Sequence, residues 1–146
     1  MVHIPWDEDT SGFKPGIYFA RIRSCEEKQT KTDGTPMFAL VIDADDFNRK
    51  LCHDNILCGG GGLGMGKAKL SCLGFGRQNP DIDPSELVGK RFYVAVKMDN
   101  YNGQDRLAVD VKQGKAGYWP EKDPPIQGVI TPGPAPLPPI VEESPF

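Results

Sequence analysis

The chain has 146 residues and a mass of 16.0 kDa, which suffices for one hydrophobic core and leaves little room for a second. Hydrophobic residues make up 38% of it, and no apolar stretch approaches the roughly 20 residues that a membrane-spanning helix needs. The acidic first ten residues lack a signal-peptide pattern, so we expect a soluble cytoplasmic protein.

The net charge of −3 is unevenly distributed. Residues 14–115 carry 16 Lys and Arg against 13 Asp and Glu, whereas each of the two ends has a net charge of −3. Because association responds to the local potential, the acidic total does not exclude a nucleic-acid ligand. Nine of the 14 prolines follow residue 115. We therefore expect an acidic flexible N-terminus over residues 1–12, a folded domain over 13–115, and a proline-rich disordered linker over 116–146.

Three strands are predicted in the first half of the domain. Residues 16–23 alternate between two faces, as a half-buried strand does. The inward face is expected to hold Tyr18, Ala20 and Ile22, and the outward face Phe19, Arg21 and Arg23. After a turn at Asp33 and Gly34, residues 36–42 are apolar on both faces, which is typical of a central strand. Residues 50–58 form the third strand.

A helix and two strands are predicted next. Apolar residues recur at helical spacing over residues 65–73, and residues 83–89 form one short helical turn. Two alternating runs follow at 92–98 and 106–112, joined by an Asn-Gly pair that strongly indicates a hairpin. Three strands, a helix and two strands is the order of an OB fold. We therefore expect a mainly β, five-stranded OB-fold barrel with one helix between strands 3 and 4.

The four cysteines do not show the close pairs of a zinc site. The nearest two, Cys52 and Cys58, are separated by five residues and have His53 as their one histidine neighbour. Cys25 and Cys72 fall in strand and helix patterns, where a free thiol behaves as a small hydrophobe. We expect reduced structural thiols, with a metal site as the less favoured alternative, and no cofactor.

Residues 61–67 match the phosphate-loop pattern G-x-x-x-x-G-K, but Ala68 stands where that motif needs Ser or Thr. The predicted strands are also antiparallel, so a glycine hinge before a helix is favoured, and a nucleotide-binding enzyme remains the weakest alternative. Lys67 and Lys69 near the helix start are expected to attract phosphate. No catalytic arrangement is recognisable, so we expect the protein not to be an enzyme.

Aromatic and basic side chains alternate on the outward face of the predicted strands. Such a face suits single-stranded nucleic acid, because bases stack on rings for ~1–3 kcal/mol each and cations follow the phosphates. The alternative is that Phe19 and Tyr93 only pack against the helix or a neighbouring subunit. The expected DNA-binding residues are Phe19, Arg21, Arg23, Lys67, Lys69, Tyr93, Lys97, Tyr101, Arg106 and Lys112.

The chain ends in an acidic cluster closed by Pro-Phe, with Glu142, Glu143, Pro145 and Phe146 as expected partner-binding residues. This end resembles the C-terminal tip of bacterial single-stranded-DNA-binding proteins, which docks replication and repair partners. The body segments PGIYFARIRSCEEKQTKTDGTPMFALVID, DPSELVGKRFYVAVK and YNGQDRLAVDV are similar to a family of phage-encoded single-stranded-DNA-binding proteins with OB folds, first catalogued as a domain of unknown function.

This resemblance implies a phage or prophage protein that binds single-stranded DNA non-specifically during replication or recombination in the bacterial host cytoplasm. It also implies that the tip recruits replication or recombination proteins, with homodimerisation left open. The alternative is an OB-type protein-interaction adaptor without nucleic-acid binding.

Overall fold

A computed structural model describes residues 1–2, 13–101 and 103–131, with Tyr101 described through its backbone. The predictions about the acidic N-terminus, the Tyr101 side chain and the C-terminal tip therefore lie outside the described residues. Within the described part of the chain, no helix is long and apolar enough to span a membrane.

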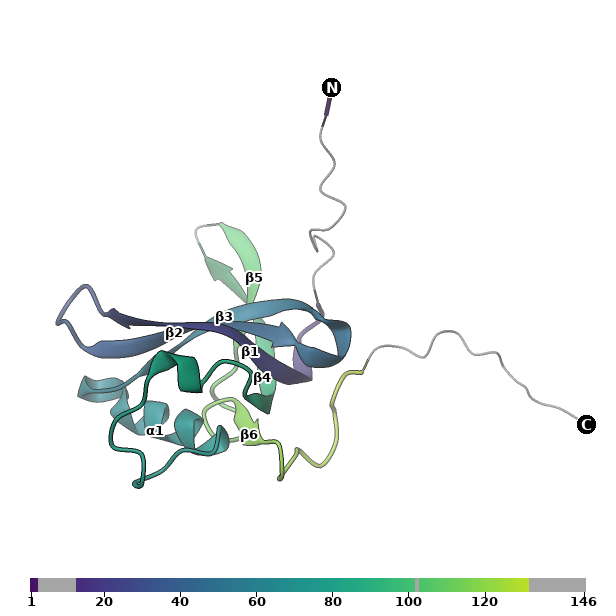
Figure 1. Ribbon diagram of the computed structural model, residues 1–146. Coiled ribbons are helices and arrows are strands. Elements are labelled where there is room, and N and C mark those ends of the chain that lie inside the picture. Colours follow the sequence, from purple (N-terminus) through teal and green to yellow (C-terminus); the bar gives the residue numbers. More distant parts are fainter. Residues whose placement is uncertain (3–12, 102, 132–146) are drawn as a thin grey trace, which may run out of the picture.

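Antiparallel strands dominate the described residues (Figure 1). They are β1 (Gly16–Gln29), β2 (Pro36–Ala44), β3 (Arg49–Leu57), β4 (Arg91–Tyr101), β5 (Gln104–Val109) and β6 (Tyr118–Pro120). The single α-helix, α1 (Leu63–Cys72), lies between β3 and β4, and three short 3-10 turns complete the described elements: η1 (Asp45–Phe47), η2 (Gly60–Gly62) and η3 (Pro84–Glu86). The predicted mainly β architecture, with its helix after the third strand, is confirmed.

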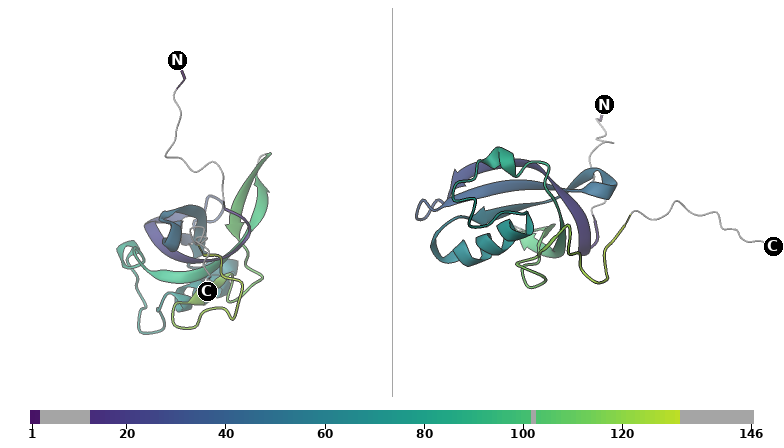
Figure 2. Two further views of the ribbon diagram at one scale, coloured as in Figure 1. Left: turned by 90° about the vertical axis from the view of Figure 1, so that its right-hand side faces the viewer. Right: turned by 60° about the horizontal axis from the view of Figure 1, so that its bottom comes forward.

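The hydrogen-bonded path through the sheet runs β3-β2-β1-β4-β5, and β6 pairs with β4 beside it. β3 and β5 approach each other, but no ladder joins them in the described part of the chain, so the sheet is not closed. The outer part of the β4–β5 hairpin projects away from the other strands (Figures 1 and 2). The sequence predicted a five-stranded barrel, whereas the described sheet has a sixth strand, β6, and is not closed between β3 and β5.

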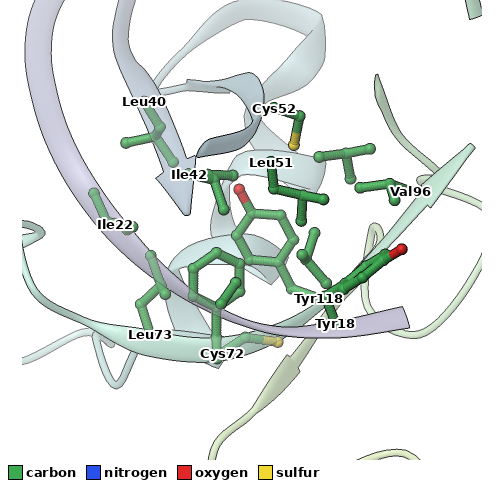
Figure 3. Close-up of a cluster of buried hydrophobic side chains, with 14 of the residues drawn as sticks. Tyr18, Ile22, Leu40, Ile42, Leu51, Cys52, Cys72, Leu73, Val96 and Tyr118 are labelled. Atoms are coloured by element: carbon green, nitrogen blue, oxygen red, sulfur yellow. The ribbon is translucent and has the colours of Figure 1, made fainter. Parts of the chain in front are cut away.

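Alternation along β1 places its side chains as expected. Tyr18, Ala20 and Ile22 are buried, while Phe19 and Arg21 are partly exposed on the opposite face. A bulge after Ile22 shifts the register against β2. The core below this face combines large buried side chains from β1, β2, β3, β4 and β6 with Cys72 of α1, and several of them appear in Figure 3. The two faces of β1 and β4 are therefore chemically distinct.

The folded unit extends beyond residue 115. Tyr118 is fully buried and its ring stacks on Phe92 at 4.5 Å between centroids. Further along, the backbone N–H of Ile130 donates to the carbonyl of Ile17 over 2.7 Å. The predicted domain end at 115 is wrong. A three-residue strand is too short to show alternation in sequence. The prolines around it indicated a disordered linker, so the sequence did not predict that Tyr118 contributes to the core.

β5 ends earlier than predicted, at Val109. The carboxylate of Asp110 accepts hydrogen bonds from the backbone N–H of Lys112 and from the Gln113 amide, which turns the chain away from the strand direction. Lys112, which was expected on a strand face, lies in this turn instead.

Candidate nucleic-acid interface

Three partly exposed rings lie side by side on the outer face of the sheet: Phe19 on β1, Tyr93 on β4 and Trp119 on β6. We call them the ring row. Phe19 pairs in register with Tyr93, and their ring centroids are 5.0 Å apart with a 47° tilt. Tyr93 pairs in register with Trp119 on its other side. The predicted outward positions of Phe19 and Tyr93 are thus those seen in the structure.

Trp119 was missed by the sequence analysis because it lies beyond the predicted domain end. Its indole packs against the turn at Gly114, where a Cβ atom would lie 2.7 Å from the Trp119 ring. Any larger residue at Gly114 would displace the indole. An adjacent Tyr-Trp pair is unusual in a disordered linker, and that pair was the available signal.

An arginine cluster borders the ring row. It consists of Arg21, Arg23 and Arg91 with the carboxylates of Asp43 and Asp45, and carries a net charge of +1. Arg21 and Arg91 pair in register across β1 and β4, one outward position along the strands from Phe19 and Tyr93. The carboxylate of Asp43 is buried, with its oxygens 3.2 Å from Arg21 and 2.7 Å from Arg23. Arg21 and Arg23 are therefore ion-paired in the free protein.

Further cations lie on the other side of the ring row. Lys97 is exposed on the same face of β4 as Tyr93, and Lys112 is exposed in the turn after β5. The pKa of Asp110 is lowered first by its hydrogen bond from Gln113 and then also by the charges of Lys97 and Lys112, which places both lysines near one carboxylate. This group supplies positive charge beside the rings.

Arg106 lies on β5 at the open seam. The pKa of His53 on β3 is lowered first by partial burial and then by the positive charges of Lys50 and Arg106. Lys50 and Arg106 therefore bring positive charge near His53 at the seam between β3 and β5. Arg106 is part of the β4–β5 hairpin, where it pairs in register with Asp99 of β4.

The two helix lysines have different environments. Lys67 is exposed, whereas Lys69 is only 3% exposed and its Nζ donates to Asp54 Oδ2 over 2.8 Å. The prediction that Lys69 contacts phosphate is wrong. Its helical position, three residues after the buried Gly66 and three before the buried Cys72, turns it toward β3.

Gly66, in the first half of α1, has a packing role. A Cβ atom on Gly66 would lie 1.9 Å from the carbonyl oxygen of Leu57, so only glycine lets the helix approach β3 this closely. Close packing of α1 on β3 thus accounts for a glycine at this position of the G-x-x-x-x-G-K pattern.

An open groove of about 800 Å³ lies away from the ring row. It runs between α1, the loop that follows α1, the C-terminal end of β1 near Glu27 and the N-terminal end of β2 at residues 36–38. Its apolar lining includes Phe38, Leu70 and Phe75, and its charged residues are Glu27, Lys67, Arg77 and Asp81. Lys67 therefore belongs to this groove and is not part of the ring row.

The four cysteines are free thiols, and the described residues contain no group of three or more His, Cys, Asp and Glu that could hold a metal ion. Burial is the main reason that the pKa of Cys52 is raised to about 12 and that of Cys25 to about 11. Since the thiolate is the reactive form, these thiols are poor nucleophiles at neutral pH.

No protein-family model and no curated protein sequence matches this chain. Its function is therefore inferred from the geometry of the ring row and the cations around it.

Proposed function

We propose that the protein binds single-stranded DNA without sequence preference and that its sheet is an OB-fold barrel with an open seam. The strand order β3-β2-β1-β4-β5, with a helix between β3 and β4, supports this fold, because OB barrels are Greek-key barrels that are often partly open. The similarity of the body segments to phage single-stranded-DNA-binding proteins supports a role in DNA replication or recombination.

The ring row is the observation that carries this proposal. Adjacent strands lie about 4.8 Å apart, so rings on three neighbouring strands offer a surface roughly 10 Å long. The contact between Phe19 and Tyr93 leaves no room for a base between them, so bases would stack on top of the rings. Cations on both sides of the row, in the arginine cluster and at Lys97, would follow the phosphates.

Binding of a fluorescent oligo-dT, a matched RNA oligomer and a blunt duplex at two salt concentrations tests the proposal. Neutralising phosphates releases counterions, so the affinity for oligo-dT should fall steeply as salt rises and should exceed the affinity for duplex. Equal affinity for duplex and oligo-dT, or an affinity independent of salt, would contradict single-strand binding.

Replacing Phe19 or Tyr93 by Leu should weaken oligo-dT binding by ~1–3 kcal/mol, because each change removes a stacking surface and leaves the charges in place. The slope of log affinity against log salt should stay nearly constant. Phe75→Leu, which changes a ring in the groove, is the matched control and should leave the affinity unchanged. If Phe19→Leu unfolds the protein but spares the affinity of the folded fraction, the ring serves packing alone.

Asp43→Asn should strengthen oligo-dT binding at low salt. Arg21 and Arg23 would lose a carboxylate that competes with phosphate, and the charge of the arginine cluster would rise from +1 to +2. The salt slope should steepen by about 0.7 for each additional phosphate that the arginines neutralise. Asp46→Asn, an exposed position in η1, removes one nearby negative charge as a control. A weaker affinity for Asp43→Asn alone would mean that Asp43 positions the arginines for DNA.

We further propose that Glu142, Glu143, Pro145 and Phe146 dock replication or recombination proteins, as the resemblance of the tip implies. A terminal aromatic with adjacent acidic groups fits an apolar pocket rimmed by Lys or Arg on a partner. Binding of a peptide of residues 140–146 to a purified partner, compared with the same peptide carrying Phe146→Ala, tests this role.

The alternative function, a protein-interaction adaptor without nucleic-acid binding, is supported by the groove of about 800 Å³ beside α1. It predicts no binding of any oligonucleotide at low salt, and it predicts that Phe19→Leu and Tyr93→Leu have no functional effect.

A further inference from the structure

Three polar side chains meet inside the core, and nothing in the proposed DNA contacts uses them. Lys69 of α1, Asp54 of β3 and Tyr118 of β6 form this polar core cluster. The Lys69 ammonium donates to Asp54 Oδ2 over 2.8 Å, and the Tyr118 hydroxyl donates to the same oxygen over 2.6 Å. Lys69 Nζ also lies 5.4 Å from the centre of the Tyr118 ring.

The cluster joins β3 and the nearby α1 to β6, whose Tyr118 lies 64 residues after Asp54 in sequence. Figures 1 and 2 show α1 beside β6 under the sheet, and Figure 3 places Tyr118 among the buried side chains of this region. Burial and the charge of Asp54 raise the pKa of the Tyr118 hydroxyl well above its usual value, so the hydroxyl remains a donor at all physiological pH values. A charged acceptor makes such a hydrogen bond stronger and more directional than apolar packing.

β6 is short and makes few backbone contacts. It pairs with β4 through three residues, the Ala95 N–H of β4 donates to the Gly117 carbonyl just before it, and Lys115 and Tyr118 exchange two backbone hydrogen bonds in the preceding turn. The polar core cluster adds a side-chain anchor to these contacts. Side chains alternate along a strand, so fixing Tyr118 inward sets Trp119 outward, next to Tyr93.

We propose that Trp119 is a third base-stacking ring and that the polar core cluster holds it in the ring row from the inner side of β6. This inference rests on the proposed single-strand binding. In it, Trp119 contacts the bases, whereas Lys69, Asp54 and Tyr118 are positioning residues that do not touch DNA.

Tryptophan fluorescence can isolate the ring, because the chain contains two tryptophans and Trp6→Phe leaves Trp119 as the one emitter. In that background, titration with oligo-dT should quench the Trp119 emission. Trp119→Leu should weaken oligo-dT binding about 5- to 150-fold with a nearly constant salt slope. Unchanged affinity in Trp119→Leu, or emission that does not respond to bound oligo-dT, would overturn the stacking role.

Tyr118→Phe tests the positioning role, because it removes the hydroxyl and keeps the ring on Phe92. The free protein should then show greater quenching of Trp119 by acrylamide. DNA affinity should fall, and Tyr118→Phe should add little further loss in a Trp119→Leu background. Tyr18→Phe is the matched control, since Tyr18 is equally buried and its hydroxyl donates to the Lys14 carbonyl, away from β6.

If Tyr118→Phe destabilises the protein no differently from Tyr18→Phe and leaves both acrylamide quenching and affinity unchanged, the cluster serves stability alone and the positioning role is overturned. If the unaltered protein fails to bind oligo-dT, the proposed function and the stacking role fall together. The acrylamide measurement on the free protein decides the positioning role even then, so the two failures are distinguishable.

Discussion

Ending the chain at residue 115 should lower the free energy of unfolding by at least ~3–5 kcal/mol, the loss expected when a large buried aromatic side chain is removed. The truncation deletes the fully buried Tyr118, its stacking on Phe92, and the hydrogen bond from Ile130 to Ile17. It also leaves the buried pair of Asp54 and Lys69 without the Tyr118 ring that covers it. Urea denaturation followed by circular dichroism measures the loss.

Chains that end at 131 or at 139 are the matched controls for this truncation. Both keep β6 and the contact between Ile130 and Ile17, so each should unfold at the same urea concentration as the full chain. The chain ending at 139 should also hold or raise the affinity for oligo-dT at low salt, because it lacks the acidic tip and screening is weak there. Equal stability of the 115 and 131 truncations would contradict a structural role for β6.

Asp54→Ala should cost ~3–5 kcal/mol, the loss typical of breaking a buried ion pair from one side. Lys69 would keep the Asn55 carbonyl at 3.3 Å as an acceptor, and the Tyr118 hydroxyl would lose the carboxylate to which it donates. The Lys69 side chain is only 4% exposed, so water replaces the lost carboxylate poorly. The free energy of unfolding in urea again provides the measurement.

Two further variants separate charge from hydrogen bonding at this position. Asp54→Asn keeps an acceptor for Tyr118 and should cost less than Asp54→Ala. Lys69→Met removes the buried cation and leaves a carboxylate that is 14% exposed and can be hydrated, so its loss should also be smaller. A loss below about 1 kcal/mol for Asp54→Ala would mean that solvent reaches the cluster readily.

The contributions of the ring row and of the arginine cluster to DNA affinity are expected to differ in their dependence on salt concentration. In the proposed complex, stacking on Phe19 and Tyr93 would not involve charge, whereas Arg21 and Arg23 would have to exchange the carboxylate of Asp43 for phosphate. The net gain in binding free energy from these arginines would therefore be smaller than their number implies. Single-strand affinity at high salt should depend mainly on the rings.

Local periodicity determined much of this protein from the sequence alone. Alternation in β1 and β4 is a local property with a period of two, so the burial of Tyr18 and the outward positions of Phe19 and Tyr93 were predictable. The Asn-Gly pair at 102–103 predicted the hairpin that joins β4 to β5. Helical spacing likewise predicted α1 within about two residues at its start.

Only the tertiary structure decided the features that depend on contacts between distant segments. β6 is too short to show a period, and Trp119 joins the ring row because β4 supplies a pairing edge. Lys69 is charged yet buried because Asp54, 15 residues earlier, provides a partner inside the core. Arg21 meets Asp43 across β1 and β2 only after the hairpin forms. Strand periodicity assigns a face to each residue, but the free energy of a charge on that face depends on what the fold brings opposite it.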